Sequence, residues 1–558
     1  MQSQSSMRRD SIHKKCTMGA HPIIHTYMNK LGLTDIIGAH IKQDMRVKLS
    51  CEKTIGLVVH NILTTPMPLY EFQDWLKPLD EDVLGIADAE TTFINDDRVG
   101  KALDDLYAGK HKDVFFHLAL RAIKIFKIDC SQVHQDTTSI TFAGKYGGWS
   151  AQEILTYGHS KDHRPDLKQL VLGLSVSADG GIPLVHKVYD GNQTDDKLHL
   201  DNHQRLRKLL GRTDFIYVAD CKLATTENLQ KISAFGGRFV SVMPRTWKED
   251  RKFREEIRLG KVEWQHLLAR KNNRTPQGKM DHYSIAKGKF LASAGYTIHW
   301  LRSTQKAEQD TETRLRRIEK AQTELRLLQT RLNKYHLKTR EQIVAAAKKI
   351  LKDTQASKFL IIKIETGKSV NITHKKPGRP TPGIRGTKAY SDFFSMTFTI
   401  GDQAIAEDSL DDGVFPLITN LDDKYSAKDA LEIYKFQPFL EKRHSQLKSY
   451  QEIAPMFLKK AERVVALLHV HIMALMVASL IERQIRQAMR QKKLNAIPIY
   501  PEGRDCKSPT MFDIVRLFRD VERFEVQQKG ITTVFPAQLS KVQKQVLDLL
   551  NVPVSLYH

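Results

Sequence analysis

Three carboxylates stand in the sequence where acidic side chains could hold metal ions. Asp220 directly follows the apolar run FIYVA, and in open α/β sheets functional groups gather at the carboxyl ends of strands. Asp136 lies in HQDTTSI, ahead of three hydroxyl residues, with Asp129 seven residues earlier as a rival. Glu441 lies in YKFQPFLEKRHSQLKSY. Each could equally be ordinary: a strand-end aspartate, a turn or cap residue, and a solvated glutamate paired with its helical neighbours.

If these carboxylates converge, they predict a two-metal site. Two Mg²⁺ ions about 3.5–4 Å apart would activate a water or a 3′-hydroxyl and stabilise the leaving oxygen in phosphodiester displacement. Hard oxygen ligands suit Mg²⁺, with Mn²⁺ expected to substitute, whereas the lack of clustered Cys and His in the sequence disfavours zinc. Such a site in a basic chain favours a nuclease or a strand-transfer enzyme.

Composition sets limits on the partners and the compartment. The chain has 558 residues, which suggests two to four domains, and 41% hydrophobic residues, enough to form cores. Its formal net charge of +23 favours a polyanionic partner, nucleic acid before an acidic membrane surface. The five cysteines are scattered without a CxxC spacing, which disfavours a disulfide framework and fits a reducing cytosol. The polar, basic N-terminal segment predicts no secretory signal.

One apolar run, residues 464–481, approaches the length of a membrane-spanning helix. His469 and His471 lie in its middle, and charged residues crowd both of its ends. We therefore expect a buried helix of a protein that does not enter the membrane.

The elements that would position the acids form an α/β domain in two parts. Residues 126–243 read as strand, hairpin, helix, strand, helix and strand, which predicts a mixed sheet covered by helices. Residues 411–490 return to this alternation of strands and helices, and they contain the helix with Glu441. Residues 1–125 carry apolar side chains at three- and four-residue spacing and predict a helical domain for DNA-end binding. Residues 491–558 predict a helical tail.

Residues 244–410 read as an insertion. They contain a long charged helical run whose apolar stripe predicts a helical hairpin or arm, with a dimer contact as a lesser option. Two strands follow, on either side of the basic Pro/Gly loop KKPGRPTPGIRG.

The helix around Glu441 has a particular spacing. Tyr434, Gln437, Glu441 and Lys448 are three, four and seven residues apart, which on a continuous helix places them on one polar stripe. Pro438 interrupts that helix and predicts that a new one begins there. Glu441 would then lie near a helix N-terminus, where its charge is favoured.

Taken together, these residues resemble the DDE-class transposases of bacterial insertion sequences, in the group with a Y–R–E–K signature. Tyr434, Glu441 and Lys448 match that signature, and Gln437 stands at its arginine position. HQDTTSI and YVADCKLATTENL resemble the two aspartate blocks, and GHSKDHRPDLKQLVLGLSV, YDGNQTD and DGVFPLITNL resemble the connecting motifs. The resemblance covers about residues 90–480.

The resemblance implies a ribonuclease H-like catalytic domain, interrupted by an insertion before the glutamate helix. It implies a transposase that cuts element ends and joins them to target DNA by metal-dependent transesterification. Asp136, Asp220 and Glu441 would be the catalytic residues and would bind the two metal ions. Tyr434 and Lys448 would contact DNA phosphates near the cleaved end.

The expected partners are double-stranded DNA, as terminal inverted repeats and as target, and a second copy of the chain that pairs the two ends. Lys442 and Arg443 are further candidates for contact with the DNA backbone, and Trp247 is a candidate for stacking on an unpaired base. The expected location is the bacterial cytoplasm, on the nucleoid when the protein is bound to DNA.

Three other functions stay open at this point. A hydrolytic nuclease could use the same core without strand transfer. A catalytically inactive DNA-binding protein of this fold would fit the unusual Gln437. A tyrosine recombinase is more distant, because Tyr557 lies near the C-terminus but no convincing Arg–His–Arg constellation accompanies it.

Overall fold

The computed structural model describes residues 11–42, 46–109, 111–142, 155–158, 164, 166–193, 198–271, 278–373, 387–453, 458, 460–528 and 531–558. The chain divides into two units. Unit 1 comprises residues 1–241, 419–424 and 429–558, and unit 2 comprises residues 242–418 and 425–428. The predicted insertion therefore lies within unit 2, and the predicted end-binding and catalytic regions share unit 1. The Pro/Gly loop at 375–386 and parts of two connecting motifs, at 159–163 and 194–195, lie outside the described residues.

Unit 1 contains most of the helices. They are α1 (His21–Leu31), α2 (Leu33–His40), α3 (Cys51–Thr64), α4 (Phe72–Leu76), α5 (Glu81–Leu84), α6 (Asp88–Thr91), α7 (Asp96–Ala108), α8 (His111–Phe126), α9 (Leu198–Leu210), α10 (Thr226–Ala234), α15 (Ala427–Tyr434), α16 (Gln437–Ser445), α17 (Ala461–Gln491), α18 (Met511–Phe518) and α19 (Lys541–Leu550). The strands are β1 (Ser11–Thr17), β2 (Gln132–Phe142), β3 (Lys168–Ser177), β4 (Pro183–Asp190), β5 (Ile216–Ala219), β6 (Arg238–Val242), β14 (Glu522–Gln528) and β15 (Ile531–Phe535).

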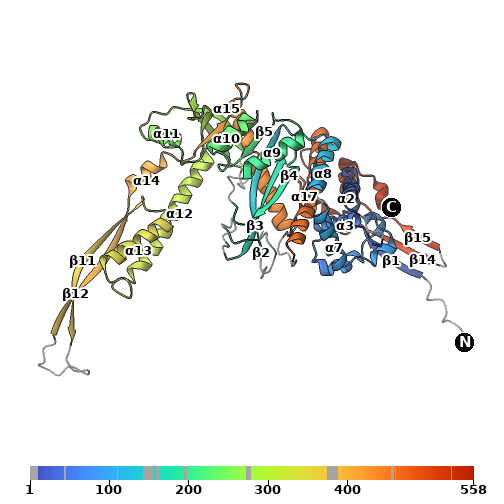
Figure 1. The fold of residues 1–558 in the computed structure, drawn as a ribbon, viewed down its shortest axis with the longest axis horizontal. Coiled ribbons are helices and arrows are strands. Elements are labelled where there is room, and N and C mark those ends of the chain that lie inside the picture. The colour runs from blue at the N-terminus through green and yellow to red at the C-terminus, as the bar shows by residue number, and fades with distance from the viewer. Residues whose placement is uncertain are drawn as a thin grey trace. The chain divides into compact units, whose positions relative to one another are not determined.

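The main sheet of unit 1 has the strand order β4-β3-β2-β5-β6 (Figure 1). β4, β3 and β2 are antiparallel, and β2, β5 and β6 are parallel, as the order of elements in the sequence predicts. β5 consists of four buried residues, IYVA, which suits a central strand covered on both faces. Helices α8, α9 and α17 pack on β4, and α16 packs on β2. A mixed sheet flanked by helices thus forms the centre of the unit.

Helix α17 is the long apolar helix of unit 1. By length and composition it could cross a membrane, and its apolar window is entirely buried inside the structure. It packs against α1, α3, α7 and α19. The helix therefore forms part of the core of unit 1, in agreement with the prediction of a buried helix.

A second sheet joins the two ends of the chain. Its strand order is β1-β14-β15, and β1 pairs with β14 from Ser11–Gln528 to Thr17–Glu522. The sequence predicted helices in both regions, and the difference arises because this pairing joins residues about 500 positions apart. Tyr557 is buried nearby, and its hydroxyl donates to Gly19 O at 3.0 Å. A buried, hydrogen-bonded phenol does not suit a recombinase nucleophile.

Unit 2 contains α11 (Lys248–Arg258), β7 (Trp264–Lys271), β8 (Met280–Ala286), β9 (Phe290–Leu291), β10 (Thr297–Ser303), α12 (Thr304–Gln329), α13 (Arg340–Asp353), β11 (Leu360–Thr373), β12 (Thr387–Ile400), α14 (Asp402–Ser409) and β13 (Val414–Thr419). Its sheet has the order β13-β10-β8-β7, with β9 paired to β10. β11 and β12 form a separate two-stranded ribbon that runs beyond α12 and α13 (Figure 1). The apolar stripe of α12 packs on α13 and the base of the ribbon, which confirms the predicted helical hairpin.

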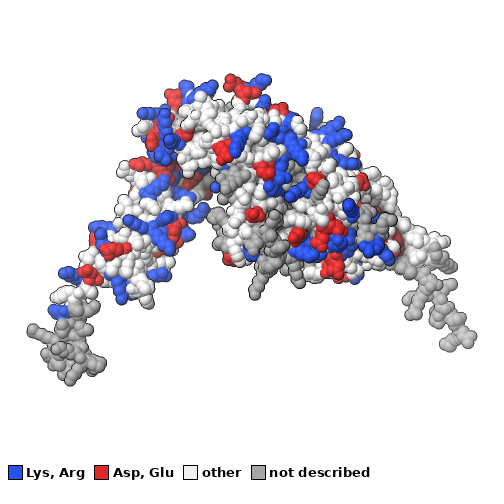
Figure 2. Space-filling view, in the orientation of Figure 1, with Lys and Arg blue, Asp and Glu red and all other residues white. Residues whose placement is uncertain are grey.

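The positive charge is spread over the surface. Lys and Arg number 87 against 64 Asp and Glu, and on the face drawn in Figure 2 blue side chains occur on both units, interspersed with red ones. The net charge alone therefore does not locate a nucleic-acid surface, and a site has to be found from specific contacts.

Buried histidines make unit 1 sensitive to acid. His111, His186 and His469 form one cluster, with ring centroids 4.3 Å apart for His111–His469 and for His186–His469. Burial, with the nearby charges of His111 and Arg205, lowers the pKa of His186 to about 3. Burial also lowers the pKa of His469 well below its usual value. These side chains are neutral in the folded protein at pH 7.

We expect the free energy of unfolding to fall as the pH drops from about 6.5 towards 4. Below about 6.5 the histidines of the unfolded chain take up protons that buried His186 cannot, and each such group costs up to about 1.4 kcal/mol per pH unit. Urea unfolding between pH 7.5 and 5 measures this slope. His186→Gln should reduce it, whereas His336→Gln, at an exposed position of unit 2, should not. If His186→Gln left this slope unchanged, the pH dependence could not be assigned to buried His186.

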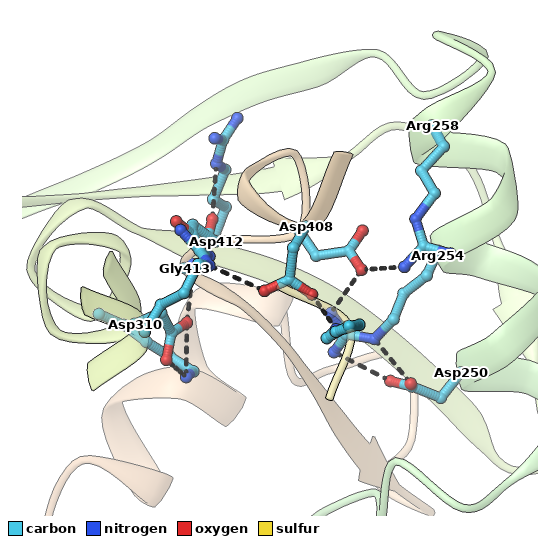
Figure 3. A network of polar contacts seen from close by, with 12 residues as sticks. Asp250, Arg254, Arg258, Asp310, Asp408, Asp412 and Gly413 are labelled. Atoms are coloured by element: carbon cyan, nitrogen blue, oxygen red, sulfur yellow. Dashed lines mark hydrogen bonds and ion pairs between the residues drawn. The ribbon is translucent and has the colours of Figure 1, made fainter. Parts of the chain in front are cut away.

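Buried ion pairs hold the helices of unit 2 to the segment before β13 (Figure 3). Arg254 Nε donates to Asp250 Oδ2 at 2.7 Å, and Arg258 Nη2 donates to Asp411 Oδ2 at 2.6 Å. Arg314 of α12 donates to Asp408 Oδ2 at 2.9 Å and also to Asp412. Burial alone would raise the pKa of Asp408, but hydrogen bonds from Lys358 and Arg314 outweigh it and hold the pKa below its usual value.

Arg314→Met is expected to destabilise unit 2 by about 3 kcal/mol, because it removes the positive charge that buried Asp412 and partly buried Asp408 share. Thermal unfolding combined with limited proteolysis would measure the loss. Lys320→Ala, at an exposed position on the same helix, serves as the matched control. Equal melting temperatures for Arg314→Met and Lys320→Ala would show that the ion-pair network contributes little to the stability of unit 2.

Candidate active site

Asp136 and Asp220 lie at corresponding positions on neighbouring parallel strands. The pairing of β2 with β5 ends at His134–Val218, and each aspartate follows two residues later. Thr137 N donates to Asp136 Oδ1 at 2.8 Å, and Lys222 N donates to Asp220 Oδ1 at 3.0 Å. The main chain thus orients both carboxylates at one edge of the sheet, and both are partly exposed.

The rival aspartate, Asp129, lies at the other end of β2. Its carboxylate accepts hydrogen bonds from Ser131 N at 2.8 Å and Ser131 Oγ at 3.0 Å, just before the strand begins. This is a local turn, and it places Asp129 away from the edge that carries Asp136 and Asp220.

The glutamate helix is anchored to β2 by Gln437. Helix α15 ends at Tyr434 and α16 begins at Gln437 with Pro438 in its first turn, so proline opens a new helix as predicted. The Gln437 amide is 7% exposed. Its Nε2 donates to Gln135 O at 3.0 Å, and its Oε1 lies 3.0 Å from His134 Nδ1. One side chain therefore bonds two consecutive residues of the strand that carries Asp136.

His134 is the donor in the second of these bonds. Burial lowers the pKa of His134 to about 4, although the Gln437 hydrogen bond opposes the shift, so the imidazole is neutral at pH 7. Because Gln437 Nε2 is committed to the Gln135 carbonyl, Oε1 must accept from His134 Nδ1–H. Gln437 and Glu441 are one turn apart on α16, but the Gln437 amide is buried against β2 whereas Glu441 is exposed.

All three predicted acids act on the pKa of Tyr434. Burial raises its pKa above the usual value, and the charges of Asp220, Cys221, Glu441 and Asp136 raise it further. Asp136 lies on β2, Asp220 directly after β5 and Glu441 at an exposed position of α16, so the charges that act on this phenol come from three different elements.

A further side chain, His444, joins this group and was not singled out from the sequence. It is buried on α16, and its Nε2 lies 3.7 Å from Asp136 Oδ2. The signal that could have identified it is its spacing, three residues after Glu441 on the same helical face.

The donor set fits a hard cation. All three groups are carboxylates, whose oxygen atoms are the ligands that hard cations such as Mg²⁺ prefer. Among the residues that the structure describes, no three His, Cys, Asp or Glu side chains are close enough together to form a complete metal-binding cluster. Asp136, Asp220 and Glu441 therefore do not form a ligand cage in this structure.

The other predicted DNA-binding residues fall in different surroundings. Lys442 is exposed on α16, with its Nζ 5.1 Å from the centre of the Phe439 ring. Lys448 is partly exposed on a π-helical turn, Gln446–Tyr450, that extends α16. Trp247 lies in unit 2, where it caps the N-terminus of α11 and is partly buried.

Arg443 has a structural position that its sequence context did not reveal. Its side chain is 6% exposed, and its Nη1 lies 2.7 Å from Glu482 Oε2 of α17. Its Nε and Nη2 donate to Gly181 O at 3.1 Å and Gly180 O at 2.6 Å in the β3–β4 turn. The guanidinium is thus occupied within the chain, which corrects the prediction that it contacts the DNA backbone.

Comparisons with known proteins match only part of this picture. Residues 14–120 match the family model described as a domain of unknown function, DUF4277. The search of curated proteins gives no match. Among solved structures, the chain is similar to a piggyBac transposase in a synaptic complex with hairpin DNA, with a TM-score of 0.39 and 8% identity. That similarity covers 88% of this chain and 79% of the other.

We expect Gln437→Leu to lower the free energy of unfolding by about 2 kcal/mol, because it leaves the buried Gln135 carbonyl and the His134 N–H without partners. It should also loosen α16 on β2. Urea unfolding and hydrogen exchange of β2 amides would measure both effects. Ser445→Ala, an exposed change on the same helix, is the control, and wild-type stability of Gln437→Leu would contradict the anchoring role.

Proposed function

We propose that the protein is a DNA transposase of an insertion sequence, which cuts element ends and joins them to target DNA by metal-dependent transesterification. The observation that carries the proposal is the equivalent placement of Asp136 and Asp220, each two residues beyond the pair His134–Val218 on neighbouring parallel strands, with the helix that carries Glu441 packed on β2. The same three acids belong to the motifs that resemble DDE-class transposases, in a ribonuclease H-like arrangement.

In this proposal Asp136, Asp220 and Glu441 hold two Mg²⁺ ions, with Mn²⁺ able to substitute. When bound, these ions activate a water or a 3′-hydroxyl and stabilise the leaving oxygen. Main-chain N–H groups hold the carboxylates of Asp136 and Asp220 in place for this task. Because its pKa is raised, Tyr434 keeps its proton, and its hydroxyl can donate to a phosphate oxygen. Lys448 supplies a positive charge on the next turns of the helix.

The proposed partners are double-stranded DNA, both as terminal inverted repeats and as target, and a second copy of the chain on paired ends. The net charge of +23 supports binding to a polyanion. Residues 1–125 are proposed to recognise the ends, in the bacterial cytoplasm and without membrane attachment.

Glu441→Gln is expected to reduce Mg²⁺-dependent cleavage of element-end DNA by about 10²–10³-fold or more, because one metal ligand is lost while the shape is kept. Binding to the same DNA should change little. Cleavage assays and gel-shift titrations measure the two effects. Asp129→Asn is the matched control and should cleave normally, since Asp129 only caps a turn.

Retained cleavage by Glu441→Gln would overturn the role of Glu441. Incubation of pre-cleaved ends with a supercoiled plasmid then separates the enzymatic alternatives, because only a transposase yields joined products and a hydrolytic nuclease yields none. DNA binding by the wild-type protein without metal-dependent nicking would favour an inactive DNA-binding protein.

A further inference from the structure

A cavity adjoins the glutamate helix in unit 1. Its volume is about 700 Å³, which is within the range of small-molecule sites. It is formed by α16, the β3–β4 turn, the C-terminal half of α17 and the residues that lead into α18. No role has been assigned to it in the proposed cleavage reaction.

Two arginines in the floor of this cavity are bonded within the chain. Arg443 is bonded to Glu482 and to the Gly180 and Gly181 carbonyls, as described above. Arg483 pairs with Asp179 at 2.5 Å. The buried polar groups of the floor therefore satisfy one another and fix the shape of the cavity.

The lining carries a surplus of positive charge. Its charged residues are Lys442, Arg443, Arg483, Arg486 and Arg490, against Asp179 and Glu482. Arg483, Arg486 and Arg490 are three and four residues apart and therefore share one face of α17. Asp179 and Glu482 are paired with arginines in the floor. Lys442 and Arg490 are exposed at the rim. The cavity is thus built for an anion.

One wall of the cavity is aromatic. The Phe436 and Phe439 rings are stacked, with centroids 4.7 Å apart and planes inclined by 19°. Phe439 is 41% exposed, whereas its neighbour Leu440 is fully buried. An aromatic face beside cations is the combination that binds nucleic-acid bases together with their phosphates.

We propose that this cavity binds a nucleotide, with the base stacked on Phe439 and the phosphate held by Lys442 and Arg490. The cavity is too small for a double helix, so the nucleotide comes either from an unpaired DNA strand or from the free nucleotide pool. The unpaired-strand source rests on the proposed transposase function, because α16 also carries Glu441. The free-nucleotide source does not depend on that function.

Equilibrium binding tests the proposal with two probes, fluorescein-labelled (dT)10 and dTMP. Both are titrated against full-length Glu441→Gln protein in EDTA, so that the result does not depend on cleavage. Phe439→Ala should weaken binding about 5- to 100-fold, the range of one lost stacking interaction. Arg490→Ala should weaken binding several-fold and reduce the salt dependence by about one phosphate contact. Phe439→Trp should retain binding, and Lys544→Ala, an exposed change on α19, is the matched control.

The two probes separate the sources. Variant-sensitive binding of dTMP supports a free nucleotide, and variant-sensitive binding of (dT)10 alone supports an unpaired strand. Competition by inorganic phosphate as strong as that by dTMP would overturn the stacked base. The site would be overturned if Phe439→Ala and Arg490→Ala left the binding of both probes unchanged, or if neither probe bound at all. Either result would count whether or not the wild-type protein cleaves DNA.

Discussion

A single buried amide determines where the glutamate helix lies. Gln437 bonds both His134 and the carbonyl of Gln135, so the first turn of α16 is fixed on β2. Leaving such groups unpaired in the core would cost about 1–3 kcal/mol each, which makes other registers of the helix unfavourable. The placement of Glu441, one turn later, follows from that bond.

A second anchor acts at the far end of the same helix. Arg443 reaches the carbonyls of Gly180 and Gly181, whose φ angles of +89° and +65° belong to the left-handed region. A Cβ at Gly180 would lie 2.9 Å from the Arg483 side chain, so glycine there also permits close approach. The nine-residue helix α16 is thus fixed at both ends, to the strand and to the turn.

The two anchors give the faces of α16 different surroundings. One face approaches the carboxylates at the edge of the sheet, where charge is negative. The next face, with Phe439 and Lys442, borders a cavity whose cations outnumber its acids. Opposite potentials on neighbouring faces of one short helix would let it hold cations on one side and phosphates on the other.

Local patterns in the sequence were enough to predict the hairpin of β3 and β4, the apolar strand before Asp220 and the helix that Pro438 opens. These features depend on alternation, turn residues and proline geometry, which neighbouring residues determine. The sequence could not show that β1 pairs with β14, because that contact joins opposite ends of the chain. Nor could it distinguish Lys442 from Arg443, adjacent cations of which one is exposed and the other buried. Only the tertiary packing decides such a difference, because it determines which face of a helix packs on the core and which carbonyl groups there can accept a hydrogen bond.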